Sequence, residues 1–298
     1  MASPDAGLLR WAVRIAAPGS EVVEVRGLRD GGAPWRLRLR QGGADRAVVL
    51  RVGEDPAPLA TEAAALELAA GHGIPAPRLL AAGLDRDPPV VLVEAVEGAS
   101  TIPAARPPAR LRALGRAAAA LAAIPLVPTP TLPRRDRPIA TVDFAALRRR
   151  PPPRPLLLEA EARLAALPPS REPAGFVHGD LWQGNALWAA ETLAALVDWD
   201  CAGAGPAGVD LGSLRCDAAV CFGTGAADDV LAGWEEGAGR PAAEVARWDL
   251  VAALSTPPDM GWFPGAIAGQ GRPDLGREVL LARRDGFLRD ALDRLGGG

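Results

Sequence analysis

Lysine and tyrosine are absent from this chain of 298 residues, so all 33 basic side chains are arginines. They are balanced by 36 acidic side chains, whereas a protein that binds nucleic acid normally carries a basic excess. We therefore expect no nucleic-acid partner. No apolar run reaches the roughly 18–20 residues that span a bilayer, so we expect no membrane partner. Residues 1–21 also lack the long apolar core of a signal peptide, which predicts a cytoplasmic protein.

Cysteine and histidine are scarce. The three cysteines, Cys201, Cys216 and Cys221, are odd in number and lack the paired spacing of a zinc site. The chain has only two histidines, so we do not expect a metal centre built from histidine side chains. We expect three reduced, mostly buried thiols, as in a cytosolic protein.

The remaining composition is typical of a folded protein, with 49% apolar and 23% charged residues, and the length suggests two domains or lobes. Alternating apolar and charged residues predict strands in the first part of the chain. A stretch rich in Ala and Leu predicts a helix over residues 61–70, capped by Thr61. The expected strands are residues 21–28, 35–40, 47–52, 78–82 and 90–96, after a short helix over 4–17. Residues 1–96 should therefore form a five-stranded antiparallel sheet with one inserted helix.

The composition changes after residue 96, where a linker rich in proline and small residues begins. Beyond it the pattern predicts mainly helices, with a brief return to β-structure within residues 175–199. The expected helices are residues 110–124, 143–167 with a break at 151–153, 210–222, 227–236, 242–254 and 274–295. The fold class is thus α+β, with a small antiparallel β-sheet lobe over 1–96 and a larger, mainly helical lobe over 97–298.

The strongest chemical signal is FVHGDLWQGN at residues 176–185, followed by LAALVDWD at residues 193–200. Residues 186–188 lie between these two stretches and residues 193–199 lie within the second, and the two segments are expected to pair as a hairpin. That hairpin would return Asp198 to a position beside the end of the first stretch.

Three side chains of these stretches suit phosphoryl transfer. Asn185 and Asp198 offer an amide oxygen and a carboxylate, which are ligands that a hard cation such as Mg²⁺ prefers. Asp180 is left to orient and deprotonate an incoming hydroxyl. A base, an amide and a carboxylate are the residues that transfer of a phosphoryl group from a nucleotide requires.

Three motifs then follow one another in the chain: His178-Gly179-Asp180-x4-Asn185, Val197-Asp198-Trp199-Asp200 and Gly205-Pro206-x3-Asp210-Leu211. In this order they resemble the aminoglycoside phosphotransferase and choline kinase-like group, small-molecule kinases with a bilobal protein-kinase-like fold. The resemblance implies that Asp180 is the catalytic base and that Asn185 and Asp198 bind Mg²⁺. It also implies that Asp210 is a buried carboxylate that accepts backbone N–H bonds, and that His178 shapes the loop.

The same resemblance implies nucleotide-binding residues in the first lobe. Arg51, at the end of a predicted strand, would bind the phosphates of ATP, or of GTP, and Glu62 at the start of the next helix would hold it in place. Lysine is more usual at this position, and arginine binds phosphate with a different geometry. The turn at residues 27–32 makes a poor glycine-rich phosphate loop.

The purine would lie where the last strand of the first lobe enters the linker. The backbone of Glu94 and Val96 would form hydrogen bonds to it, with Val49 on one face of the ring and Leu187 on the other. Packing in the core is the alternative role of these apolar side chains.

The small-molecule acceptor should bind to the helical lobe. An aminoglycoside-like acceptor, and with it antibiotic resistance, competes with a metabolite kinase of the ketosamine, choline-like or homoserine-like kind. A nucleotide-binding pseudokinase is the non-enzymatic alternative. The candidate residues near the acceptor are acidic, or else apolar and aromatic: Asp200, Asp217, Glu235, Glu236, Asp259, Trp182, Trp199 and residues 260–263.

Overall fold

The computed structural model describes residues 3–29 and 32–296. The chain divides into two compact units, Met1–Glu97 and Gly98–Gly298. This division lies one residue after the boundary expected between residues 96 and 97. Within the described residues, every helix is too short or too polar to cross a membrane.

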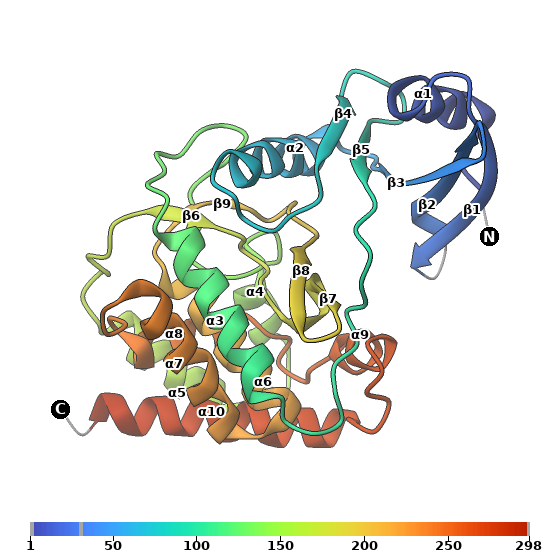
Figure 1. Cartoon of the computed structure of the whole chain (residues 1–298). Helices are drawn as coiled ribbons and strands as arrows, with labels where there is room; N and C mark the ends of the chain where they lie inside the picture. Colours follow the sequence, from blue (N-terminus) through green and yellow to red (C-terminus); the bar gives the residue numbers. More distant parts are fainter. Residues whose placement is uncertain (1–2, 30–31, 297–298) are drawn as a thin grey trace. The chain divides into compact units, whose positions relative to one another are not determined.

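The first unit is built on a five-stranded sheet with the order β1-β2-β3-β5-β4, in which all neighbouring strands are antiparallel (Figure 1). Its strands are β1 Glu21–Arg29, β2 Gly32–Gln41, β3 Ala44–Val52, β4 Leu79–Gly83 and β5 Val90–Glu94. The sequence alternates because only one face of β2 and β3 is buried: Leu37, Leu39, Val48 and Leu50 are at most 1% exposed. The expected antiparallel sheet is confirmed.

Helix α1, Ala6–Ala16, packs Leu8 and Trp11 against the buried face of this sheet. It begins after Asp5, whose carboxylate accepts two N–H groups of the first turn at 2.6 and 2.9 Å. The short helix expected at the start of the chain therefore contributes to the core of the first unit.

Helix α2, Pro56–Gly71, begins five residues before the expected start. Its N-cap is Asp55, not Thr61, and the Asp55 carboxylate accepts a backbone N–H at 2.9 Å. A proline at the first helical position lacks an N–H that would have no partner there, so it favours this earlier start. Thr61 and Glu62 consequently lie inside the helix, and both side chains are buried.

The second unit is mainly helical and contains two small two-stranded sheets. Its helices are α3 Pro108–Ala122, α4 Phe144–Arg148, α5 Pro155–Ala165, α6 Gly208–Phe222, α7 Ala227–Ala238, α8 Val245–Leu254, α9 Phe263–Gly269 and α10 Arg277–Gly296, with 3₁₀ turns η1 Gln183–Asn185 and η2 Thr224–Ala226. Its strands are β6 Gly175–Val177, β7 Ala186–Ala189, β8 Thr192–Leu196 and β9 Gly203–Gly205. Helix α9 and strand β9 were not expected, because both are short and rich in glycine and alanine.

Helices α3 and α7 lie side by side in the second unit (Figure 1). Glycine allows their backbones to approach closely. A Cβ on Gly115 would lie 2.1 Å from the carbonyl oxygen of Val230, and a Cβ on Gly233 would lie 2.1 Å from that of Arg112. Glycine inside a helix costs about 0.5–1 kcal/mol relative to alanine, a cost that this packing offsets.

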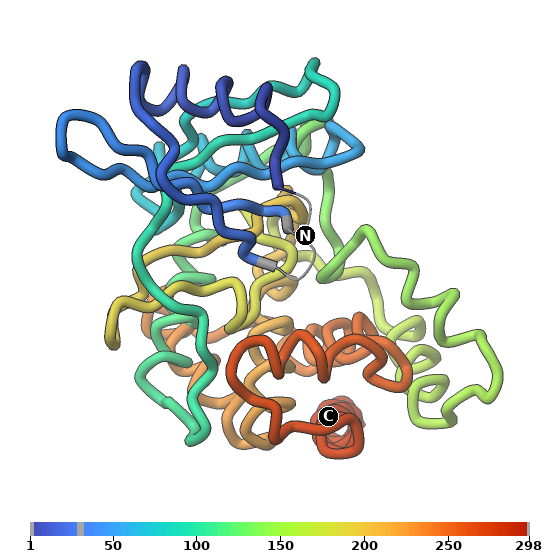
Figure 2. Tube along the Cα trace, turned by 90° about the vertical axis from the view of Figure 1, so that its right-hand side faces the viewer, coloured from blue at the N-terminus to red at the C-terminus, as the bar shows by residue number. Residues whose placement is uncertain are grey.

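The carboxylate of Asp249 joins three helices of the second unit, because it binds an arginine from each of two other helices. Arg215 on α6 donates from Nε and Nη2 to the two carboxylate oxygens of Asp249 on α8, at 2.8 and 2.9 Å. Arg294 on α10, the helix seen end-on near the C-terminus in Figure 2, donates to Asp249 at 2.6 Å. Asp249 is completely buried and Arg215 is 1% exposed. These bonds therefore help to set the position of α6.

All three cysteines are free and buried, as expected. Burial raises the pKa of Cys216 to about 12, so its thiol stays protonated and unreactive.

Candidate active site

Two of the sequence motifs meet at a small sheet in the second unit. Strand β6 pairs with β9. The loop that follows β6 therefore begins beside the point where the loop that precedes β9 ends. Gly179 in the first loop has a φ of +79°, and a Cβ there would lie 2.1 Å from the carbonyl oxygen of Cys201 in the second. Both the backbone conformation and the available space therefore require glycine at residue 179.

Asp210, in the first turn of α6, braces the loop over residues 178–185. Its Oδ2 accepts the N–H of His178 at 2.7 Å, and its Oδ1 accepts the N–H of Gly179 at 2.9 Å. Burial raises the pKa of Asp210 to about 6, and the two backbone donors oppose the rise. The carboxylate thus fixes the backbone just before Asp180.

The buried ring of His178 joins the two motif segments. Its Nε2 lies 3.0 Å from the carbonyl oxygen of Val197, and the N–H of Asp180 points at its Nδ1 over 3.4 Å. The ring also packs against Trp199, with centroids 4.4 Å apart. Burial lowers the pKa of His178 to about 4, although the Val197 carbonyl and the Asp198 charge favour the cation. A neutral ring held on both sides supports the expected structural role.

We expect His178 to make folding depend on pH. Its pKa is about 4 in the folded protein and about 6.5 in an unfolded chain, so on acidification the unfolded state takes up the proton first. This contribution to stability is complete above about pH 6.5 and falls by about 3 kcal/mol as the pH approaches 4. Urea unfolding of the wild type and of His178→Gln across this range tests the prediction. The stability difference between the two should shrink on acidification, and a constant difference would contradict a neutral buried ring.

Asp180 and Asn185 contact each other within the loop. The Asn185 Nδ2 donates to the carbonyl oxygen of Asp180 at 2.9 Å and to its carboxylate Oδ2 at 3.2 Å. The amide oxygen of Asn185 is therefore the atom left to bind a cation. Burial raises the pKa of Asp180 to about 8, and the nearby carboxylates of Asp198 and Asp200 add to the rise. A pKa near neutrality suits a group that exchanges a proton during catalysis.

The hairpin after the loop is formed by β7 and β8, and its second strand is shorter than expected. That strand ends at Leu196 and not at Trp199, because Trp199 turns into the core. The Trp199 ring is fully buried, stacks on Phe176 with centroids 5.5 Å apart, and donates its N–H to the Leu196 carbonyl at 2.8 Å. Trp199, one of the aromatic candidates near the acceptor, therefore packs in the core.

The hairpin places the backbone around Asp198 against the end of the first motif. The N–H of Val197 donates to the carbonyl oxygen of Asn185 at 2.9 Å, and Asp198 follows directly. Asp198 has a φ of +69°, which is uncommon for a residue other than glycine. Such conformations gather at functional sites, which supports a functional role for this carboxylate.

A cavity of about 160 Å³ in the second unit adjoins Asp180. Its wall includes Trp182 from the loop, Asp217 from α6, and Trp262 and Phe263 at the start of α9. The sequence did not separate these residues from other acidic and aromatic candidates, because they are far apart in the chain and line one cavity only in the folded protein.

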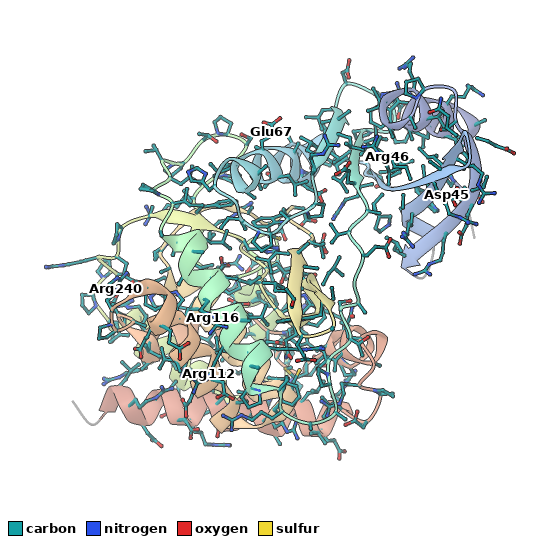
Figure 3. The ribbon with its side chains drawn as sticks, in the orientation of Figure 1. Asp45, Arg46, Glu67, Arg112, Arg116 and Arg240 are labelled. Carbon is teal, nitrogen blue, oxygen red and sulfur yellow. The ribbon has the colours of Figure 1, made fainter. Side chains whose placement is uncertain are left out.

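The other acidic candidates do not line this cavity: Asp200, Glu235, Glu236 and Asp259. Glu236 on α7 pairs with Arg112 and Arg116, which are labelled on α3 in Figure 3. Asp259 pairs with Arg277 at 3.2 Å. Exposed ion pairs of this kind contribute little to stability and indicate solvated surfaces.

In the first unit, Arg51 on β3 and Glu62 on α2 form an ion pair. The Arg51 Nε lies 2.8 Å from the Glu62 Oε2, and the two side chains are only 17% and 4% exposed. The expectation that Glu62 opens the helix was wrong, since α2 begins earlier. The pair forms nevertheless, because Glu62 lies on the face of α2 that is buried.

The end of β5 differs from the expectation. The strand ends at Glu94, whose carboxylate pairs with Arg78, and this guanidinium is the main cause that lowers the pKa of Glu94 to about 2. The N–H of Glu94 donates to the Arg78 carbonyl at 2.9 Å, and that of Ala95 donates to β3 at 3.1 Å. Within residues 94–96, all of which the structure describes, the N–H of Val96 has no backbone partner, so it is available as the expected donor to a purine.

Val49 on β3 and Leu187 on β7 are both half-buried. They belong to different units, so their expected positions on the two faces of a purine stay a prediction. The glycine turn at residues 27–32 lies partly outside the described residues, which omit 30 and 31.

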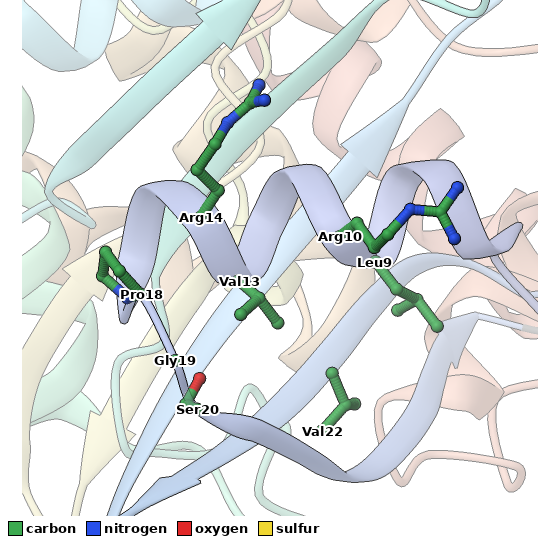
Figure 4. A pocket seen from close by; sticks show the side chains of 8 residues that line it. All are labelled: Leu9, Arg10, Val13, Arg14, Pro18, Gly19, Ser20 and Val22. Atoms are coloured by element: carbon green, nitrogen blue, oxygen red, sulfur yellow. The ribbon is translucent and has the colours of Figure 1, made fainter.

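The first unit also has a cavity of about 360 Å³ between α1 and the start of β1 (Figure 4). Leu9 and Val13 of the helix face Val22 of the strand there. None of the expected nucleotide-binding residues lines this cavity.

Residues 24–248 match the model of the phosphotransferase enzyme family. A comparison with curated proteins found no match. Among solved structures, the macrolide 2'-phosphotransferase MphH from Brachybacterium faecium is 20% identical, with 93% of this chain and 97% of that chain covered and a TM-score of 0.62. The aminoglycoside-3'-phosphotransferase of type VIII is 24% identical, with 83% and 98% covered and a TM-score of 0.55.

A thermostable mutant of the aminoglycoside phosphotransferase APH(4)-Ia, in a ternary complex with AMP-PNP and hygromycin B, is 16% identical, with 93% and 96% covered and a TM-score of 0.58. At these identities the structural likeness establishes the fold, and the expected α+β protein-kinase-like fold is confirmed. Because the family model spans most of the sequence, the chain belongs to the phosphotransferase enzyme family, whose members transfer a phosphoryl group to a hydroxyl group of a small molecule.

Proposed function

We propose that the protein transfers the γ-phosphoryl group of ATP, or of GTP, to a hydroxyl of a small molecule, with Mg²⁺ as the metal. One observation carries this proposal. The Asn185 amide contacts Asp180 at 2.9 and 3.2 Å, and the residue before Asp198 bonds to the Asn185 carbonyl. A base, an amide and a carboxylate that converge in this way suit phosphoryl transfer.

A nucleoside triphosphate is the proposed donor. The complex of APH(4)-Ia with AMP-PNP supports this choice. In the first unit, Arg51 is proposed to bind the phosphates, since its guanidinium is held by Glu62 at 2.8 Å and can form paired bonds to phosphate oxygens. The Val96 N–H is proposed to donate to the purine.

The donor chemistry of Asn185 and Asp198 fits Mg²⁺. Asn185 uses its amide nitrogen within the loop, so both residues present oxygen to a cation. Across residues 3–29 and 32–296, no group of three His, Cys, Asp or Glu side chains could hold a metal ion. Mg²⁺ is commonly bound by one or two protein side chains together with substrate phosphates and water, which agrees with a pair of ligands. When bound, Mg²⁺ offsets the charge that develops on the phosphate oxygens.

Asp180 is proposed to act as the base. Its side chain adjoins the cavity in which an acceptor hydroxyl would lie. It would orient that hydroxyl and accept its proton as the new oxygen–phosphorus bond forms and the bond between the γ-phosphorus and the β–γ bridging oxygen breaks, which releases the nucleoside diphosphate. Asp210, through the backbone N–H groups of His178 and Gly179, keeps the loop that carries Asp180 in position.

Asp198→Ala is expected to remove Mg²⁺-dependent phosphoryl transfer. Loss of a metal ligand should cost several kcal/mol of transition-state stabilisation, which corresponds to a rate at least about 100-fold lower. The test follows phosphorylated products by mass spectrometry, with a panel of aminoglycosides, macrolides, amino sugars and amino alcohols. The matched control is Asp228→Ala, which removes a carboxylate that is 76% exposed on α7. Retained activity in Asp198→Ala, or turnover independent of Mg²⁺, would refute the assigned metal site.

Two acceptor classes follow from different observations. Macrolide and aminoglycoside phosphotransferases among the similar structures support an antibiotic acceptor, and with it a role in resistance. The small cavity beside Asp180 supports a compact metabolite instead. A cytoplasmic location is part of the proposal, since the three free thiols are typical of a reducing compartment. Nucleotide binding without any phosphorylated product would support the pseudokinase alternative.

A further inference from the structure

The cavity beside Asp180 is small and mainly apolar. Its volume of about 160 Å³ is below the roughly 300–1,000 Å³ of pockets that enclose a drug-sized ligand. Apolar side chains from the loops, α6 and α9 make most of its wall: Ile139, Trp182, Val220, Trp262, Phe263 and Ile267. The cavity can therefore enclose a compact molecule, or a single ring of a larger one.

Most hydroxyl groups on this wall already have partners. Ser255 and Thr256 donate their hydroxyl protons to backbone carbonyls of α8 at 2.8 and 2.7 Å. Over the residues that the structure describes, no basic side chain lines the cavity. The charge that a ligand meets is therefore set by two carboxylates, those of Asp180 and Asp217.

One oxygen of Asp217 is well bonded and the other is not. Oδ2 accepts the backbone N–H of Gln183 at 3.2 Å and its side-chain amide at 2.7 Å. Among the residues that the structure describes, only the thiol of Cys221 bonds to Oδ1, at 3.7 Å. Burial raises the pKa of Asp217 to about 6, so the carboxylate is mainly ionised at neutral pH. Asp217 thus contributes to the wall of an apolar cavity a carboxylate with one weakly bonded oxygen.

Buried arginines fix the turn that forms the back of the cavity. Arg284, fully buried, donates to the Thr256 hydroxyl at 2.7 Å and to the Pro258 carbonyl at 2.8 Å. Arg148 donates to the Leu254 carbonyl. The wall between α8 and α9 is therefore held in place by the protein itself, which limits how far the cavity can widen around a ligand.

We propose that the acceptor is a compact alcohol with an apolar body and a single basic amine, bound with the amine at Asp217 and the hydroxyl at Asp180. This inference rests on the proposed function and names its substrate class. An acceptor with several ammonium groups would place most of them against apolar walls, where a charge without a partner is costly. The ring faces of Trp182 and Trp262 suit both the apolar body and the single cation.

Calorimetric titration without nucleotide tests the binding site independently of catalysis. The probes are 2-amino-1-phenylethanol, its uncharged N-acetyl derivative and the polycation kanamycin. Asp217→Asn should weaken binding of the amino alcohol about 10- to 100-fold, as expected for loss of a hydrogen bond to a charged group, and leave the N-acetyl derivative unaffected. Asp259→Asn removes the same charge from a carboxylate outside the cavity and should bind like the wild type.

The same probes are then offered with nucleotide and Mg²⁺, and products are identified by mass spectrometry. We expect a higher kcat/KM for the amino alcohol than for kanamycin. A preference for kanamycin, absence of amino-alcohol binding, or equal weakening of both amino-alcohol probes in Asp217→Asn would overturn the inference. Transfer to kanamycin would then leave the proposed function intact. Binding that depends on Asp217, without transfer to any alcohol in the panel, would support the cavity assignment and refute the proposed function.

Discussion

Replacing Asp180 with asparagine is expected to lower kcat about 100- to 10,000-fold, the range that a positioned general base contributes. Asparagine keeps the size of the side chain and its hydrogen-bonding capacity, so the 178–185 loop should stay folded on Asp210. What is lost is the group proposed to accept the proton of the acceptor hydroxyl. Nucleotide affinity should change little, because the proposed nucleotide-binding residues lie mainly in the first unit.

Steady-state kinetics with a phosphorylated product identified by mass spectrometry would measure this effect, and nucleotide titration would measure affinity separately. Asp200→Asn is the matched control, since it makes the same change in charge two residues after Asp198. Asp200 influences Asp180 through its charge, so its loss should cost far less in kcat. Turnover by Asp180→Asn at close to the wild-type rate would mean that another group accepts the proton.

Asp249→Asn is expected to lower the free energy of unfolding by about 3–5 kcal/mol, because removing one partner of a buried ion pair leaves the other charge without compensation. Asp249 is completely buried, and Arg215, its principal partner at 2.8 and 2.9 Å, is nearly so. The substitution preserves shape, so the loss reports the charge and not a cavity. Urea unfolding followed by far-ultraviolet circular dichroism would measure it.

Asp228→Asn provides the comparison for this stability effect. Its carboxylate lies 3.8 Å from the same arginine but is 76% exposed, so its loss should cost about 0–1 kcal/mol. If both substitutions had equally small effects, apolar packing and not the ion pair would hold α6 in place. The position of α6 matters for the proposed function, because this helix carries Asp210, which braces the 178–185 loop, and Asp217 in the cavity wall.

The elements whose pattern extends over many residues were predictable. Strands β1 to β3 alternate because one face of the sheet is buried, and this alternation is visible without a structure. Helices α3, α6 and α10 are likewise long enough to show their type. The motif around Asp180 was also recognisable, because His178, Gly179 and Asp180 must be adjacent in the chain to form one loop.

Element ends were less predictable, because single side chains decide them. Helix α2 starts where the Asp55 carboxylate accepts a backbone N–H, although two prolines in residues 55–60 obscured that start. Strand β8 stops where Trp199 enters the core and bonds to the Leu196 carbonyl. Short α9 has too few residues for a periodic pattern to emerge.

The α+β class, the order of the longer elements and the phosphotransferase motifs could be predicted from the sequence, since these depend on local periodicity and on residues that are neighbours in the chain. Only the tertiary structure decided which acidic and aromatic candidates share a cavity. Asp217 and Trp262 come from segments far apart in sequence, and they line one cavity because buried contacts among α6, α8 and α10, including the Arg215–Asp249 pair, set how these helices pack. Such contacts depend on the complementary shapes and charges of distant surfaces, which no local pattern contains.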